Sequence, residues 1–365
     1  MINDVAVQVV TKYLRKGNMA RCLRDILPAS SLTKEQREAV ADIIHTVVRW
    51  KRLYEHVMEN QGIPLTAETY VKLATDSTSV DPTSFPFEYR YSCSPYVARV
   101  LKSHEEWIEY INESPPTTLC VNLNTSSVDQ VVSLLQNEAL TVERSGLPTA
   151  LRTTSVSKYS KVVHEHLAHV QDESSQLVSY LAAFLGDSVF DFCAGNGGKS
   201  LALASLTQNK KTLSAYEMNI AKRSTLRQRC KEYGAEVIVE DSVPRKTFDV
   251  VLVDAPCTGL GAARRNPEVK YIDGAGSLPQ TQLSLLSQAA DNVKPGGFLF
   301  YAVCTMTLNE TSQVIEEFVQ KNPFFLFSPD GFMYKKYLQP TSFGFITIIP
   351  QGDIFFLSVL RKSEE

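Results

Sequence analysis

The chain has 365 residues, of which 44% are apolar and 21% charged, a balance that supports a packed core and excludes global disorder. The formal net charge of −3 excludes a polycation of the histone type but is compatible with a local basic surface. No apolar run reaches the ~18 residues of a membrane span, and the first residues lack the features of a signal peptide. We therefore expect two or three domains in an intracellular protein without a membrane partner.

Cysteines and histidines limit the chemistry that is available. Seven cysteines are widely spaced, and no Cys-x-x-Cys pair occurs. An odd number at such spacing disfavours a disulfide framework or a zinc site, so we expect a reducing compartment and no metal. His169 is the last of six histidines. Chemistry in the second half must then use Cys, Asp, Glu or Lys, which excludes a Ser-His-Asp triad lying wholly there.

Residues 1–75 are predicted to be helical. Thr33 and Gln36 have the spacing of a capping box, and apolar residues over 40–58 recur mostly every three or four positions. Basic residues outnumber acidic ones in this part of the chain, and a tight basic cluster is made of Arg49, Lys51 and Arg52 around Trp50. This cluster is either a solvated helix face or part of a module that faces nucleic acid.

The middle of the chain gives mixed signals. Residues 76–88 are rich in turn formers and are predicted to be a linker. Short helices are expected at 96–101 and 128–138, and a strand at 119–123. Residues 89–165 are therefore predicted to form a small α+β subdomain.

From about residue 166, short apolar runs alternate with helical stretches, which predicts an α/β domain whose mostly parallel sheet has helices on both faces. The expected strands are 188–192, 212–217, 236–241, 248–254 and 298–304. The expected helices are 199–206, 221–233, 278–293 and 310–320. A late hairpin, 343–349 with 354–360, would add antiparallel strands at the sheet edge. That ending is typical of Rossmann-like class I methyltransferases, so 166–365 is the predicted catalytic domain.

Each predicted parallel strand ends in a polar or reactive side chain. In an open α/β sheet, ligands bind outside the carboxyl ends of the strands. The residues at these ends are Asp191, Glu217, Asp241, Asp254 and Cys304. Their shared position is the strongest indication of a functional site in the sequence.

A glycine-rich loop follows the first of these strands. Its glycines are Gly195, Gly197 and Gly198. The loop is not a P-loop, because Cys193 occupies the position of the first required glycine, and Ser200 replaces the last glycine of a dinucleotide loop. What remains is close to the loop that lets backbone approach the amino-acid part of S-adenosylmethionine. Glu217 then has the position of a ribose-binding carboxylate or of a solvated strand end, and Asp241 is expected to accept from the adenine amino group.

Two cysteines follow strand ends and differ from the others. Cys257 stands in Asp-Ala-Pro-Cys-Thr-Gly-Leu-Gly (254–261), where proline and glycine favour a tight loop that displays the thiol. Cys304 ends the run Phe-Leu-Phe-Tyr-Ala-Val-Cys. Arg264 and Arg265 follow the first loop and are expected to contact an RNA phosphate backbone. The cysteines predicted to be small core residues are Cys22, Cys120 and Cys230.

Taken together, these segments resemble the Sun (Fmu/Nol) family of RNA cytosine-5 methyltransferases. Further matches are Gln-Asp-Glu-Ser-Ser-Gln (171–176), Gln282 and Lys-Pro-Gly-Gly (294–297). The resemblance covers about 90–365, and the N-terminal helices resemble more loosely the NusB-type RNA-binding domain that some members carry. The sequence departs from the family in having Val303 where Thr is usual and Cys120 where Arg is common.

The resemblance implies a role for each site residue. Cys304 would be the nucleophile, Cys257 would assist release of the product, and Asp254 would contact the base. The implied cofactor is S-adenosylmethionine. The residues expected to hold it are Asp191, Cys193, Ala194, Gly195, Asn196, Gly197, Gly198, Lys199, Glu217, Asp241 and Asp254.

The implied reaction is methylation of carbon 5 of a cytosine in structured RNA through a covalent cysteine–cytosine intermediate. A thiolate that adds to carbon 6 makes carbon 5 nucleophilic, and a second thiol assists its expulsion, so no histidine is required. The base would be single-stranded or flipped out. Ribosomal RNA is the first expected substrate and transfer RNA the second. We expect a monomer in the cytoplasm, or in the nucleus or nucleolus of a eukaryote.

Two alternatives remain at this point. One is a nicotinamide-dependent dehydrogenase on a similar sheet, which the glycine spacing and the paired cysteines disfavour. The other is a non-catalytic RNA-binding scaffold that keeps the methyltransferase fold.

Overall fold

The structure is a computed structural model that describes residues 1–76, 81–154, 156, 160–328, 331 and 333–364. The chain forms two compact units. The first comprises Met1–Ser114 and Ala262–Gly274, and the second comprises Pro115–Gly261 and Ala275–Glu365. The expected boundaries at 88/89 and 165/166 differ from this division, and part of the predicted linker, 77–80, lies outside the described residues.

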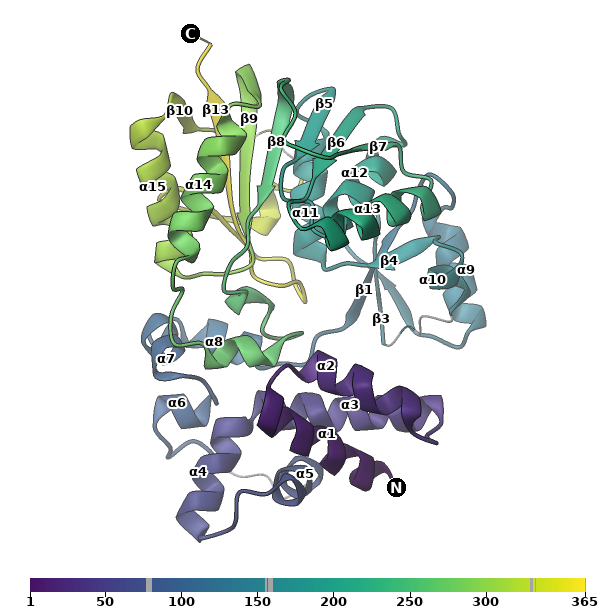
Figure 1. The fold of residues 1–365 in the computed structure, drawn as a ribbon, viewed down its shortest axis with the longest axis vertical. Helices are drawn as coiled ribbons and strands as arrows, with labels where there is room; N and C mark the ends of the chain where they lie inside the picture. The colour runs from purple at the N-terminus through teal and green to yellow at the C-terminus, as the bar shows by residue number, and fades with distance from the viewer. Residues whose placement is uncertain (77–80, 155, 157–159, 329–330, 332, 365) are drawn as a thin grey trace. The chain divides into compact units, whose positions relative to one another are not determined.

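The first unit is helical, as expected for the start of the chain (Figure 1). Its helices are α1 (Ile2–Lys16), α2 (Met19–Ile26), α3 (Lys34–Arg49), α4 (Lys51–Gln61), α5 (Ala67–Thr75), α6 (Phe87–Arg90), α7 (Pro95–Leu101) and α8 (Glu105–Ile111). The predicted capping box begins α3: Thr33 Oγ1 accepts from the backbone N–H of Gln36, whose side chain accepts from the N–H of Thr33. The apolar faces of α1 and α3 meet in a core that includes Val9, Val10 and Ile44.

Residues 262–274 belong to the first unit, in which two of their basic side chains are buried. Lys270 Nζ donates to the carbonyl oxygens of Arg49, at 2.8 Å, and Tyr91, at 3.3 Å. Burial lowers the pKa of this ammonium to about 7. The Arg264 guanidinium is also fully buried and donates to the Tyr110 hydroxyl at 2.8 Å and the Ser114 carbonyl at 3.2 Å. Tyr110 on α8 and Ser94, the N-cap of α7, both bond to this segment, so α7 and α8 join the first unit and not an α+β subdomain.

The second unit contains a four-stranded antiparallel sheet followed by a nine-stranded sheet (Figure 1). The small sheet has the order β2-β3-β1-β4 and consists of β1 (Thr117–Val121), β2 (Val142–Arg144), β3 (Ala150–Thr153) and β4 (Ala168–Val170). The helices beside it are α9 (Val128–Asn137) and α10 (Lys161–His164). The predicted strand at 119–123 and helix at 128–138 are thus both present, but they form part of the second unit.

The large sheet has five parallel strands and an antiparallel edge. Its order is β11-β12-β13-β9-β8-β5-β6-β7, with β10 paired to β13. The parallel strands are β5 (Ser188–Asp191), β6 (Thr212–Tyr216), β7 (Val237–Glu240), β8 (Phe248–Asp254) and β9 (Val293–Val303). All five predicted strands are confirmed. Their near-continuous apolar runs reflect burial on both faces.

Helices cover both faces of this sheet. They are α11 (Glu173–Ala183), α12 (Gly198–Thr207), α13 (Ile220–Glu232), α14 (Leu278–Ala290) and α15 (Ser312–Lys321). The chain runs from β5 through β6 to β7 on one side and through β8 to β9 on the other. Because such crossovers are right-handed, α12 and α13 lie on one face and α14 on the opposite face. The predicted doubly covered sheet is therefore confirmed.

The edge strands come from the end of the chain. They are β10 (Phe324–Leu326), β11 (Leu338–Thr341), β12 (Gly344–Thr347) and β13 (Phe356–Lys362). The predicted hairpin is present as β12 and β13, and β13 pairs antiparallel with β9. The sequence analysis did not predict β10 and β11. The start of β9 was predicted at residue 298, but the strand begins at Val293. Gly297 within it packs closely, since a Cβ at this position would lie 2.9 Å from the Asp249 carbonyl oxygen.

No helix within the described ranges is long and apolar enough to cross a bilayer. The same residues hold no group of three or more Cys, His, Asp or Glu side chains arranged for a metal ion. All seven cysteines are free thiols.

Candidate active site

The predicted strand-end residues meet at one edge of the large sheet. β5 ends at Asp191 and β8 at Asp254, and Cys304 directly follows β9. Glu217 and Asp241 directly follow β6 and β7. Because these strands are parallel, their carboxyl ends share this edge, and β5 lies between β6 and β8, where the crossover direction reverses. This reversal is the usual ligand-binding position in doubly wound sheets.

Two thiols lie in contact at this edge. The Sγ atoms of Cys257 and Cys304 are 3.5 Å apart, although the residues are 47 positions apart in the chain. Both side chains are partly exposed. The hydrogen bond with Cys257, burial and the nearby Asp254 carboxylate raise the pKa of Cys304 well above its ordinary value, while Lys199 opposes this rise.

An ion pair borders the thiols. Lys199 Nζ donates to Asp254 Oδ2 at 2.6 Å and lies 5.1 Å from the centre of the Phe355 ring. The Lys199 side chain is 7% exposed, whereas that of Asp254 is 34% exposed, so the carboxylate keeps a face open to a ligand. The sequence analysis assigned Lys199 only to the cofactor loop, and the pairing of its ammonium with Asp254 was not predicted.

The glycine loop is shaped by its backbone. Gly195 has φ +55° and open space where a Cβ would stand, while Gly197 has φ +88° and a Cβ there would lie 2.5 Å from Leu226 Cδ1. Both therefore need glycine, one for its conformation and the other also for close packing. Gly198 begins α12. Ala194 is buried, and the Asn196 carbonyl oxygen accepts from the Arg229 guanidinium at 2.7 Å.

Carboxylates hold this loop from two sides. Glu217 Oε2 accepts from the Gly195 N–H at 2.9 Å, and Glu217 Oε1 accepts from the Asn219 N–H at 2.7 Å. Asp191 is buried and accepts from the Ser200 hydroxyl at 2.6 Å; burial raises the pKa of Asp191 to about 7. Burial also raises the pKa of the neighbouring Cys193 thiol.

The outer end of the site is more exposed. The Asp241 side chain is 82% exposed, and its Oδ1 accepts from the Arg227 guanidinium at 2.7 Å, a bond that lowers the pKa of Asp241. Met218, directly after Glu217, is 80% exposed. A large apolar side chain in water beside a carboxylate is an available surface for a flat ring. The sequence analysis missed it, although a methionine directly after a predicted ligand-binding strand end was a usable signal.

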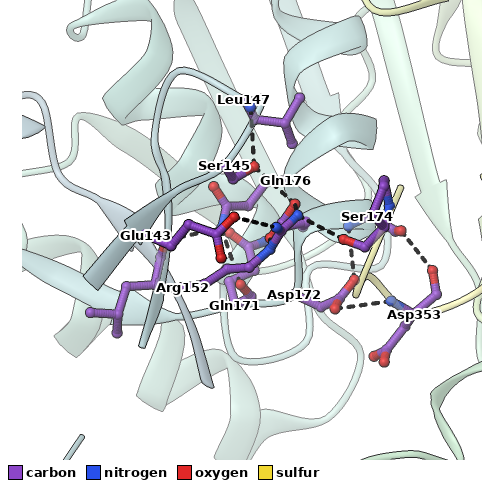
Figure 2. A network of polar contacts seen from close by, with 12 residues as sticks. Glu143, Ser145, Leu147, Arg152, Gln171, Asp172, Ser174, Gln176 and Asp353 are labelled. Carbon is purple, nitrogen blue, oxygen red and sulfur yellow. Dashed lines mark hydrogen bonds and ion pairs between the residues drawn. The ribbon is translucent and has the colours of Figure 1, made fainter. Parts of the chain in front are cut away.

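A polar network connects the small sheet with the loop before β13 (Figure 2). Glu173 is fully buried and accepts from Arg152 on β3 and from the Ser145 hydroxyl. Arg152 also donates to the Pro350 carbonyl oxygen at 2.7 Å. Two further bonds join α11 to Asp353: Ser174 Oγ donates to its carbonyl oxygen at 2.6 Å, and its N–H donates to Asp172 Oδ2 at 3.0 Å.

This network positions a wall of the site. Ile354, the residue after Asp353, donates its N–H to the Gly261 carbonyl oxygen at 3.1 Å, and the Gly261 N–H donates to the Cys304 carbonyl oxygen at 2.9 Å. Phe355 follows and lies against Lys199. Side chains of the Gln-Asp-Glu-Ser-Ser-Gln motif thus hold the segment before β13, whose backbone bonds continue to the Cys304 loop.

The two predicted RNA-binding arginines differ. The Arg264 side chain has no exposed surface, because its guanidinium is buried among residues of the first unit. The prediction that Arg264 contacts an RNA phosphate is therefore wrong. A cluster of two arginines in a loop gives no sequence signal for which of them is buried. Arg265 is partly exposed.

Comparisons with known proteins agree with this geometry. The model of the family described as 16S rRNA methyltransferase RsmB/F matches residues 178–361. The probable ribosomal RNA small subunit methyltransferase B of Bacillus subtilis (strain 168) is 31% identical over 272 residues, which are 68% of this chain and 60% of that protein. The ribosomal RNA small subunit methyltransferase B of Citrobacter koseri is 31% identical over 62% of this chain and 57% of that protein. The chain thus spans about 60% of the length of these curated relatives.

Solved structures share the fold. The crystal structure of PH0851 superposes with a TM-score of 0.82 at 21% identity and covers 99% of both chains. NSun6 from Pyrococcus horikoshii with SFG superposes with a TM-score of 0.63 at 16% identity and covers 74% of this chain and 97% of that one.

The sheet order and the antiparallel edge, together with the family match, define a protein of the Rossmann-like methyltransferase class. Within that class, the chain belongs to the RsmB/F methyltransferase family, which is the Sun family that its motifs resemble.

Proposed function

We propose that this protein transfers a methyl group from S-adenosylmethionine to carbon 5 of a cytosine in RNA. Ribosomal RNA is the first expected substrate, because the curated relatives are ribosomal RNA methyltransferases, and transfer RNA is the second. The observation that carries the proposal is the pair of thiols 3.5 Å apart, beside the Lys199–Asp254 ion pair, at the ligand edge of the sheet. A dehydrogenase has no use for two adjacent thiols at this position.

Cys304 is the proposed nucleophile. Its sulfur would add to carbon 6 of the base and make carbon 5 nucleophilic. After methyl transfer, the proton on carbon 5 must leave and the carbon–sulfur bond must break. Cys257 would assist that step: its thiol would give a proton to the departing Cys304 sulfur, which is 3.5 Å away, and the resulting thiolate would take up the proton that carbon 5 loses.

Asp254 is the proposed base-binding residue. Its partly exposed carboxylate is oriented by Lys199, and it would accept from the exocyclic amino group of cytosine. Lys199 would stabilise negative charge near the ring and near the sulfur. A paired cytosine hides its face, so the target base would be single-stranded or flipped out.

The glycine loop and the carboxylates fit S-adenosylmethionine, which supplies the methyl group when bound. The open space beside Gly195 permits close approach of the methionine part to backbone. Glu217 would accept from the ribose hydroxyls, and Asp241 from the adenine amino group. The exposed Met218 would lie against the adenine ring. Asp191, Cys193, Ala194, Asn196, Gly197, Gly198 and Lys199 complete the proposed cofactor-binding set, and Arg265 is the remaining proposed contact with RNA phosphate.

The test is methyl transfer from radiolabelled S-adenosylmethionine to ribosomal and transfer RNA, followed by bisulfite sequencing of the product. Cys304→Ser should abolish transfer and leave cofactor binding intact, because it removes the nucleophile alone. Cys257→Ala should accumulate a covalent protein–RNA adduct that migrates slowly on a denaturing gel. Full activity of Cys304→Ser would exclude Cys304 as nucleophile. Wild-type protein that binds RNA without methylating either class would support the scaffold alternative.

A further inference from the structure

Two loops carry the two thiols, and one buried carboxylate connects them. The loop after β8 contains Cys257, and the loop after β9 contains Cys304. Glu310 lies at the end of the second loop and is fully buried. We propose that Glu310 is the positioning residue that holds Cys257 against Cys304. This inference rests on the proposed function for its importance in catalysis but not for its geometry.

The hydrogen bonds to Glu310 come from three segments of the chain. Glu310 Oε1 accepts from the Thr258 N–H at 2.8 Å and from Gln282 Nε2 on α14 at 3.1 Å. Glu310 Oε2 accepts from the Thr258 hydroxyl at 2.7 Å and from the Thr307 hydroxyl at 2.6 Å. Each carboxylate oxygen therefore has two donors, and two of the four bonds hold the residue next to Cys257.

Further contacts fix the same geometry. The Tyr301 hydroxyl donates to the Glu310 carbonyl oxygen at 2.7 Å, which anchors the backbone of Glu310 to β9. Gln282 Nε2 also donates to the Pro256 carbonyl oxygen at 2.9 Å, so the residue before Cys257 is held from the same centre. The Thr258 and Thr305 hydroxyls lie 3.0 Å apart and connect the residues that follow the two cysteines.

This arrangement matters because two thiols act on one bond only if they keep contact. A shift of about 1 Å between reacting groups costs large factors in rate. Both loops are short and irregular, and the one that carries Cys257 also contains Pro256 and Gly259. The backbone bond from the Gly261 N–H to the Cys304 carbonyl oxygen joins the loops at one point, and the four donors on Glu310 add side-chain contacts between them.

The experiment measures the distance between the thiols directly, without RNA or cofactor. Dibromobimane becomes fluorescent when it forms thioether bonds with two thiols and releases two bromide ions and two protons. Peptide mass spectrometry identifies the bridged pair, so the other five cysteines need not be replaced. The wild-type protein should yield the Cys257–Cys304 bridge. Glu310→Ala should reduce its rate by about tenfold or more, because hydrogen bonds to a charged group are lost.

Matched variants separate positioning from folding. Glu310→Gln keeps an oxygen for the Thr258 N–H, and its amide can donate to the two threonine hydroxyls, so it should restore most of the bridging rate. Thr258→Val removes one donor and should give an intermediate rate. Glu316→Ala removes an exposed carboxylate on α15 and should bridge like the wild type. Thermal unfolding and cofactor binding of each variant report on the fold.

The RNA reaction gives a second readout. Glu310→Ala should accumulate the same covalent adduct as Cys257→Ala, since Cys257 would be present but displaced. Wild-type bridging rates in both Glu310→Ala and Thr258→Val would overturn the positioning role. The positioning role would also be overturned if the bridging rate of these variants fell only as far as their fraction of folded protein. Impaired bridging in these variants, with no methylation by the wild type, would instead contradict the proposed function and leave the positioning role intact.

Discussion

At the scale of single residues, the site holds the Cys304 thiol, whose pKa is raised, near the Lys199 ammonium and the Asp254 carboxylate. The hydrogen bond with Cys257, burial and Asp254 all favour the neutral form of Cys304, and Lys199 opposes them. As the proposed nucleophile, Cys304 would therefore need help from the bound substrate to lose its proton.

The raised pKa of Cys304 predicts a pH dependence. The thiolate is the reactive form, so alkylation of Cys304 by iodoacetamide should keep rising with pH from 7 to 9, with no plateau near the value of ~8.5 for a free cysteine. Quantitative mass spectrometry of the peptide that contains Cys304 measures this rate. Cys257→Ala removes the largest cause of the shift and should move the profile to lower pH. A plateau below pH 8 in the wild type would show that the thiol is not held neutral.

At the scale of elements, a buried ion pair joins β3 to the start of α11. Arg152 and Glu173 are the partners, and the Glu173 side chain has no exposed surface. Arg152 also contacts Glu143, whose side chain is 70% exposed, at 3.3 Å. The Arg152 guanidinium thus pairs with one buried carboxylate, Glu173, and one exposed carboxylate, Glu143. The effects of removing each on stability can therefore be compared directly.

The comparison predicts two different losses of stability. Glu173→Gln leaves the Arg152 charge without its buried partner and should lower the free energy of unfolding by about 3–5 kcal/mol. Glu143→Gln removes an exposed contact and should cost less than about 1 kcal/mol. Urea unfolding followed by circular dichroism measures both. Equal losses would mean that the network in Figure 2 does not hold the loop at 350–353 in place.

At the scale of the whole molecule, the chain leaves the second unit directly after the Cys257 loop, adds residues 262–274 to the first unit, and then returns. Two basic side chains of this segment, Arg264 and Lys270, are buried there and donate hydrogen bonds to residues of the first unit. The first unit is therefore completed by a segment from the catalytic half of the sequence. It is not an independent N-terminal module.

Substitutions of the adjacent residues Arg264 and Arg265 test whether residues 262–274 stabilise the first unit. Arg264→Ala removes buried charged hydrogen bonds and should lower the free energy of unfolding by about 3 kcal/mol. Arg265→Ala should weaken RNA binding and reduce the slope of log K against log salt concentration by about one. Thermal unfolding and RNA binding at several salt concentrations separate the two. Nearly unchanged stability with weakened RNA binding in Arg264→Ala would restore the original prediction for this residue.

Local patterns in the sequence were sufficient for much of the fold. Short apolar runs identified the five parallel strands, and the Thr33–Gln36 spacing identified a capping box, because both depend on neighbours in the chain. The predicted strand positions were wrong or incomplete where pairing with a distant segment determines where a strand begins or whether it forms. Val293 begins β9 early because it pairs with Phe248, and β11 forms because it pairs with β12.

The sequence by itself determined that five strand ends carry Asp191, Glu217, Asp241, Asp254 and Cys304, because parallel strands in a doubly wound sheet must end at one edge. Only the tertiary structure decided which side chains meet there. The contact of Cys257 with Cys304, the ion pair of Lys199 with Asp254 and the burial of Arg264 join residues distant in sequence. Distances between such groups follow from packing, and no spacing along the chain encodes them.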